Sequence, residues 1–83
     1  MQTAFQEKRR TPRHRVFKGA LIAFQGRSVN CTVRNMSDGG AGLDIDGSQT
    51  VPPSFTLVLE SDRVIRRCEM IWRTERRAGV AFA

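Results

Sequence analysis

The sequence predicts an all-β domain that closes into a small antiparallel barrel. Three observations lead to this fold class. Apolar and polar residues alternate with a period of two along most of the chain, and almost no segment has the period of a helix. Glycine, proline, asparagine and aspartate interrupt this alternation, as expected at tight turns. A chain of 83 residues forms one domain, and closing its five or six short strands into a barrel hides their edges.

The first two expected strands form a hairpin. Residues 16–24 (VFKGALIAF) end at the turn residues Gln25 and Gly26, and residues 28–36 (SVNCTVRNM) follow. The apolar positions of the second segment share one face: Val29, Cys31 and Val33. We therefore expect this face to point into the core.

The next two expected strands are separated by a loop. Residues 41–45 (AGLDI) place Ala41, Leu43 and Ile45 on one face. Residues 46–53 (DGSQTVPP) form the loop, because two consecutive prolines bar a continuing strand. Residues 54–60 (SFTLVLE) then point Phe55, Leu57 and Leu59 in one direction.

The last two expected strands complete the barrel. A tight turn at residues 60–62 (ESD) leads into residues 63–73 (RVIRRCEMIWR), in which Cys68, Met70 and Trp72 share a face. The final strand is residues 78–83 (AGVAFA). We expect Trp72 and Phe82 to lie in the core or at the barrel mouth.

Composition limits the function classes. The formal charge is +6, and 40% of the residues are hydrophobic, which is ordinary for a globular domain. The apolar runs are far shorter than the roughly 20 residues that cross a bilayer, and residues 1–10 lack the apolar stretch of a secretory signal. We expect a cytoplasmic protein without membrane insertion. Cys31 and Cys68 are too few for a disulfide framework or a zinc site, and each is expected to be a small buried hydrophobe.

Two segments stand apart from the strand pattern. Residues 7–15 (EKRRTPRHR) carry a dense positive charge and no apolar side chain, and Pro12 disfavours a helix there. We assign residues 1–15 to a basic N-terminal arm and residues 16–83 to the barrel. Residues 35–40 (NMSDGG) place an amide, a hydroxyl and two glycines at a strand end, where backbone N–H groups can meet a ligand. Taken alone, that segment is better explained as an ordinary turn between strands.

Together the two segments resemble a known family. Residues 9–13 (RRTPR) match the RxxxR motif and residues 35–40 (NMSDGG) match the (D/N)xSxxG motif of PilZ domains, with a strand pair between them. The end of the chain, with CEMIWR followed by RAGVAF, is also similar to that family. The resemblance implies a six-stranded antiparallel β-barrel that binds the bacterial second messenger cyclic di-GMP. Many members continue into a C-terminal helix, which we do not expect here.

The resemblance also implies a set of ligand-binding residues: Arg9, Arg10, Arg13, Asn35, Ser37 and Gly40. Arginine suits the ligand, because a guanidinium group pairs with phosphate or lies against O6 and N7 of guanine. Asn35 and Ser37 would approach the other guanine edge, and Gly40 would keep the wall free of a Cβ atom. Many members have aspartate where this chain has Asn35. An amide accepts hydrogen bonds more weakly than a carboxylate, so we expect micromolar affinity.

Other functions remain open alternatives. A small barrel with a basic arm and a pI of about 11.0 has the electrostatic character of a nucleic-acid binder, although the sequence shows no evident stacking platform for bases. A PilZ-like interaction module that does not bind nucleotide is the third possibility. No nucleophile, base and orienting group recur together, so we expect no enzymatic activity, cofactor or metal site. The expected partners are cyclic di-GMP and a protein effector, with the chain as a monomer or a ligand-bridged dimer.

Overall fold

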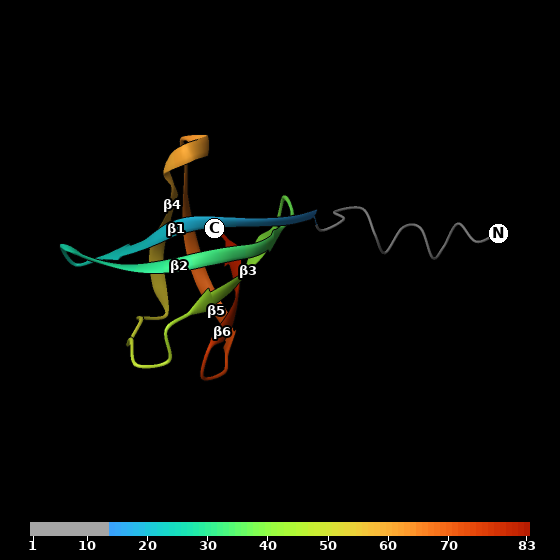
Figure 1. The fold of residues 1–83 in the computed structure, drawn as a ribbon. Helices are drawn as coiled ribbons and strands as arrows, with labels where there is room; N and C mark the ends of the chain where they lie inside the picture. Colours follow the sequence, from blue (N-terminus) through green and yellow to red (C-terminus); the bar gives the residue numbers. More distant parts are fainter. Residues whose placement is uncertain (1–13) are drawn as a thin grey trace.

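A computed structural model, which describes residues 14–83, shows a closed barrel of six antiparallel strands (Figure 1). Around the barrel the strands follow the order β1-β2-β3-β6-β5-β4. The elements are β1 (His14–Phe24), β2 (Arg27–Met36), β3 (Gly40–Ile45), β4 (Ser54–Leu59), a 3-10 turn η1 (Glu60–Asp62), β5 (Val64–Arg73) and β6 (Arg77–Phe82). The predicted all-β barrel is therefore confirmed. Within residues 14–83 no helix is long and apolar enough to cross a membrane.

The period-two alternation builds the core. All the inward positions predicted for the second, third and fourth strands are buried, and both cysteines are buried with them. The core consists of Ala20, Ile22, Val29, Cys31, Val33, Ala41, Leu43, Ile45, Phe55, Leu57, Leu59, Cys68, Ala78 and Val80. Removal of this apolar surface from water is the main force that holds the barrel together.

The turns follow the residues predicted for them. Gln25 and Gly26 join β1 to β2 with φ angles of 48° and 74°, and positive φ at both central residues suits the twist of a hairpin. The ESD segment forms η1, and Arg63 leaves it with a φ of 56°. The loop at residues 46–53 separates β3 from β4, as expected.

Bulges interrupt three strand pairs and rotate side chains from one face to the other. In β2, Arg34 is the extra residue, because Val33 pairs with Leu43 and Asn35 pairs with Gly42. In β1, residues 16–17 lie opposite that same bulge. Phe17 there has a φ of 47° and is 56% exposed.

The third bulge, in β5, overturns one prediction. Trp72 does not share the buried face of Cys68 and Met70. The extra residue Ile71 shifts the alternation, so Trp72 pairs with Gly79 on the outer face and is 49% exposed. Phe82, in contrast, is partly buried against the core, as expected.

The first residue of β1 lies beside the end of β2, next to the β2–β3 loop. Strand β1 begins at His14, which pairs with Met36 at the end of β2 (Figure 1). The strand thus starts within the segment assigned to the arm, and Arg15 pairs with Asn35. Residues 1–13 are outside the described part of the chain.

Candidate functional site

A row of laterally paired residues crosses the outer face of the barrel. Trp72 on β5 pairs with Gly79 on β6. Gly42 on β3 pairs with Gly79 on one side and with Asn35 on the other. The two glycines face outward, because the neighbours of each along its strand are buried core residues. The row therefore brings an indole and an amide from two distant strands to one surface.

The glycines of this row let the larger side chains lie close to the sheet. A Cβ atom on Gly42 would lie 2.9 Å from Asn35 Nδ2. A Cβ atom on Gly79 would overlap the Trp72 indole at Nε1. Asn35 thus lies over Gly42 and the indole lies over Gly79, an arrangement that only glycine at both positions allows.

A pocket of about 150 Å³ lies along this row. We call it the outer-face pocket, and its lining residues are Arg34, Asn35, Gly42, Leu43, Trp72, Arg77 and Ala78. It combines an aromatic ring for stacking, an amide for hydrogen bonding and two guanidinium groups for anions. Groups of these kinds can bind flat bases and anionic groups.

The β2–β3 loop is shaped by its own hydrogen bonds. The Ser37 N–H donates to the Gly40 carbonyl oxygen at 2.8 Å, and Ser37 Oγ accepts from the Gly39 N–H at 3.3 Å. The Phe82 N–H donates to the Gly39 carbonyl oxygen at 2.9 Å, which ties the loop to β6. The Ser37 hydroxyl therefore has a structural role in the turn, whatever it does for a ligand.

Gly40 also has a structural reason to be glycine. A Cβ atom at this position would overlap the carbonyl oxygen of Val80 in β6. Gly39, directly before it, has open space around the same position. The close approach of β3 to β6 thus depends on Gly40, and a contact of Gly40 with ligand remains a prediction.

A second pocket, of about 400 Å³, opens at the end of the barrel near this loop. We call it the mouth pocket, and it is lined by His14, Val16, Met36, Ser37, Asp38, Val64, Arg66 and Phe82. The Arg66 guanidinium carbon lies 5.0 Å from the centroid of the Phe82 ring. Because Ser37 lines the mouth pocket while Asn35 lines the outer-face pocket, the two motif residues border different cavities.

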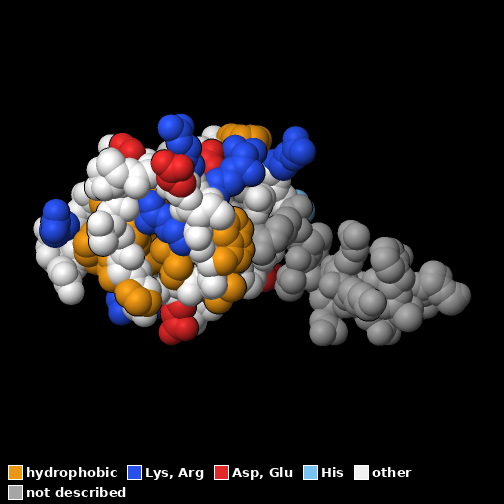
Figure 2. All heavy atoms as spheres, turned by 90° about the horizontal axis from the view of Figure 1, so that it is seen from below, with side chains coloured by type: hydrophobic (Ala, Val, Ile, Leu, Met, Phe, Trp, Pro, Cys, Tyr) orange, Lys and Arg blue, Asp and Glu red, His pale blue; other side chains and the backbone are white. Residues whose placement is uncertain are grey.

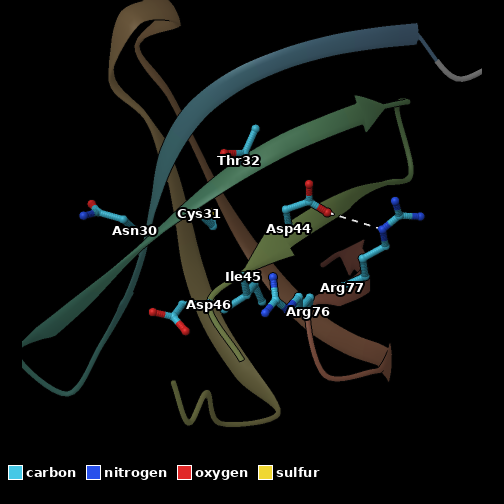
Figure 3. A pocket seen from close by; sticks show the side chains of 8 residues that line it. All are labelled: Asn30, Cys31, Thr32, Asp44, Ile45, Asp46, Arg76 and Arg77. Carbon is cyan, nitrogen blue, oxygen red and sulfur yellow. Dashed lines mark ion pairs between the residues drawn. The ribbon is translucent and has the colours of Figure 1, made fainter. Parts of the chain in front are cut away.

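A third pocket, of about 440 Å³, contains none of the predicted site residues, and we call it the polar pocket because most of its lining residues are polar or charged: Asn30, Cys31, Thr32, Asp44, Ile45, Asp46, Arg76 and Arg77. Figure 3 shows it over β2, β3 and the β5–β6 turn, with Asp44 and Arg77 paired across it at 3.5 Å. Hydrogen bonds from Ser48 to Asp46 Oδ1 lower the pKa of the Asp46 carboxyl group. This carboxylate is therefore already engaged within its own loop.

Charges of both signs are interspersed on the face of the barrel shown in Figure 2. Three ion pairs occur within residues 14–83: Lys18 with Asp62 at 2.8 Å, Arg34 with Asp44 at 2.9 Å and Arg77 with Asp44 at 3.5 Å. Among the arginines of the β5–β6 hairpin, Arg77 therefore has a carboxylate partner. The described residues contain no cluster of three or more groups that would bind a metal ion.

The predicted site residues lie in different parts of the chain. Asn35 lies on the outer face, Ser37 and Gly40 shape the adjoining loop, and Arg9, Arg10 and Arg13 lie outside the described residues. The sequence reasoning missed Gly42, Gly79 and the outward position of Trp72. The sequence did contain a signal for the two glycines, because a glycine inside a strand often marks a place where another part of the protein or a ligand comes close to the backbone.

Comparison with known proteins then identifies the chain. The family model of the PilZ domain matches residues 7–83, a span that includes both motifs and every described strand. The chain belongs to the PilZ domain family. No curated protein matches it. PilZ domains are binding and adaptor modules rather than enzymes, and the family is known for receptors of cyclic di-GMP.

Proposed function

We propose that this PilZ domain binds cyclic di-GMP and passes the signal to a protein effector in the cytoplasm, without chemistry of its own. The observation that carries the proposal is the row on the outer face, in which Asn35 and Trp72 lie at either end of the pair Gly42 and Gly79 and line the same pocket. Cyclic di-GMP offers two flat bases and two phosphate charges. The indole and amide suit the bases, and nearby guanidinium groups suit the phosphates.

The contact with one guanine is expected to combine stacking and hydrogen bonding. The half-exposed Trp72 indole offers a flat surface, and stacking of one base on an aromatic side chain contributes about 1–3 kcal/mol. The carbonyl oxygen of the Asn35 amide can accept a hydrogen bond from guanine N1–H or N2–H. An aromatic ring and an amide in one pocket favour a base over a simple anion.

The basic arm is proposed to supply further guanidinium groups. Arg15 pairs with Asn35, so the described part of the chain begins next to the row. We propose that Arg9, Arg10 and Arg13 reach the ligand from this side, since an extended chain spans about 3.3 Å per residue. Closure of the arm over the ligand is the change that we expect an effector to recognise. No resident cofactor is required for this role.

Calorimetric titration tests the proposal. Cyclic di-GMP, GTP and a mixed single-stranded DNA are each titrated into the wild type and into the Arg9→Ala/Arg13→Ala variant. We expect micromolar binding of cyclic di-GMP to the wild type, and loss of that binding in the variant with an unchanged circular dichroism spectrum. The Arg27→Ala/Arg67→Ala variant is the matched control, because it removes the same charge from other exposed positions.

Two outcomes contradict the proposal. One is the absence of any heat with cyclic di-GMP in a folded wild-type sample. The other is binding of DNA that both double variants weaken equally and that falls steeply with salt, since this is the behaviour of a nonspecific nucleic-acid binder.

A further inference from the structure

The outer-face pocket contains two arginines that belong to neither sequence motif. Arg34 is the bulge residue of β2, and Arg77 is the first residue of β6. Both line the pocket together with Asn35 and Trp72. We propose that Arg34 and Arg77 form the phosphate-binding part of this pocket, so that the barrel itself holds one phosphodiester of the ligand. This inference rests on the proposed function.

Asp44 lies between the two guanidinium groups, hydrogen-bonded to that of Arg34 and ion-paired with that of Arg77. Its Oδ2 atom accepts from Arg34 Nη1 at 2.9 Å, and Arg77 Nε lies 3.5 Å from its Oδ1 atom. Oδ1 is buried and has no hydrogen-bond partner among the described residues. The carboxylate therefore engages one edge of Arg34 strongly and Arg77 only weakly, and both arginines retain N–H groups for another acceptor.

Arg34 is restrained from a second side. Its guanidinium carbon lies 5.3 Å from the centroid of the Phe17 ring, in the β1 bulge opposite. A cation held against an aromatic ring and a carboxylate loses little freedom when it binds a ligand, and such preorganisation favours affinity. The side chain of Arg34 still remains 33% exposed, so its guanidinium is accessible from outside.

The local charge suits one phosphodiester. Two guanidinium groups and one carboxylate leave a net charge of +1, and a phosphodiester carries a charge of −1. Guanidinium groups also bind phosphate through paired N–H donors, which lysine cannot reproduce. The base position beside Trp72 and the phosphate position beside Arg34 then lie in the same pocket, as they must for one nucleotide.

The test is a titration of cyclic di-GMP into Arg34→Gln and Arg77→Gln, with Arg67→Gln as the control. Arg67 is exposed on β5 and loses the same charge, but it does not line the pocket. We expect each pocket variant to raise the Kd about tenfold and the control to change it less than about twofold, because a charged hydrogen bond is the stronger kind. Arg34→Lys should behave as Arg34→Gln does, since it keeps the charge and loses the paired donors.

The Asp44→Asn variant distinguishes two possible effects of this carboxylate on ligand binding: its negative charge, and its positioning of Arg34 and Arg77. If charge alone mattered, removal of this carboxylate would tighten the binding of an anion. Because the proposed role of Asp44 is to position two arginines, we expect Asp44→Asn to weaken binding. Tighter binding would overturn this positioning role.

A second measurement uses the wild type alone, so its result does not depend on whether a variant folds. In the wild type, the Nε–H resonances of Arg34 and Arg77 should shift on addition of cyclic di-GMP, and that of Arg67 should not. Wild-type binding that is unchanged in both pocket variants, or that leaves these resonances in place, overturns the phosphate subsite alone. A folded wild type that does not bind cyclic di-GMP overturns the proposed function, and the subsite with it.

Discussion

At the scale of single residues, the two adjacent glycines of the NMSDGG segment have different surroundings. A Cβ atom on Gly40 would overlap the Val80 carbonyl oxygen, whereas Gly39 has free space. The sequence motif presents both as parts of a ligand loop. The structure shows that one of them is required for strand packing.

Gly40→Ala should therefore destabilise the barrel, and Gly39→Ala should not. The clash is with backbone, which cannot move aside as a side chain can, so we expect a loss of about 1–3 kcal/mol for Gly40→Ala. For a domain of this size, each kcal/mol lowers the Tm by about 4–8 °C. Thermal melts followed by circular dichroism measure both variants. Equal Tm values for the two would contradict the packing role of Gly40.

Asn35 makes the second prediction at this scale. Asn35→Asp replaces an amide with a carboxylate, which accepts more strongly from guanine N1–H and N2–H. We expect the Kd for cyclic di-GMP to fall about tenfold, or about 1.4 kcal/mol. Calorimetry at constant ionic strength checks this. Asp38→Asn, a charge change in the adjoining β2–β3 loop and outside the outer-face pocket, is the control, and weaker binding by Asn35→Asp would contradict the assignment of Asn35.

At the scale of elements, regular alternation was predictable and the bulges were not. The inward positions of β2, β3 and β4 follow from period-two patterning. Alternate side chains of a strand point to opposite faces, and burial of the apolar face away from water is favourable. Trp72 was assigned to the wrong face, because nothing in the local sequence marks Ile71 as an extra residue. A bulge arises from pairing with the neighbouring strand, and that information is distant in the chain.

The β1–β2 turn gives a prediction for an element. Gln25 has a φ of 48°, a conformation that asparagine adopts more readily than glutamine, and Asn-Gly is the preferred pair for such a turn. We expect Gln25→Asn to stabilise the domain by about 0.5 kcal/mol. Gln49→Asn is the control, since Gln49 does not adopt a positive φ. Chemical denaturation measures both, and a loss of stability in Gln25→Asn would show that the side chain of Gln25 matters more than its backbone.

At the scale of the whole molecule, the closed barrel and the family were predictable from the sequence, but the pocket was not. The two motifs and the strand count were visible in the linear order of residues. The outer-face pocket combines residues from β2, β3, β5 and β6, and their alignment depends on the register of the closed sheet. The Arg34–Asp44–Arg77 cluster was missed for the same reason.

The barrel core predicts how stability depends on alkaline pH. Burial raises the pKa of the Cys31 thiol from 9.0 to about 12 and that of the Cys68 thiol to about 11. The folded state thus holds thiol protons that the unfolded chain releases, so the contribution of the two thiols to the free energy of unfolding should be constant well below pH 9 and fall as pH rises towards 11–12.

Urea denaturation between pH 8 and pH 10.5 measures this dependence. The chain has no tyrosine, which removes one group that titrates in the same range. The Cys31→Ala/Cys68→Ala variant should have a smaller slope with pH, whatever its absolute stability. Identical slopes for the two proteins would contradict the account of the core thiols.

The central claim is that cyclic di-GMP binds on the outer face, between Asn35 and Trp72. Chemical-shift mapping by two-dimensional NMR tests it most directly, because Trp72 is the only tryptophan and its indole N–H signal is unambiguous. On addition of cyclic di-GMP, we predict the largest shifts at the Trp72 indole, the Asn35 side-chain amide and the backbone N–H groups of Gly42 and Gly79. Shifts confined to the mouth pocket or the polar pocket, with the Trp72 indole unmoved, would contradict the account.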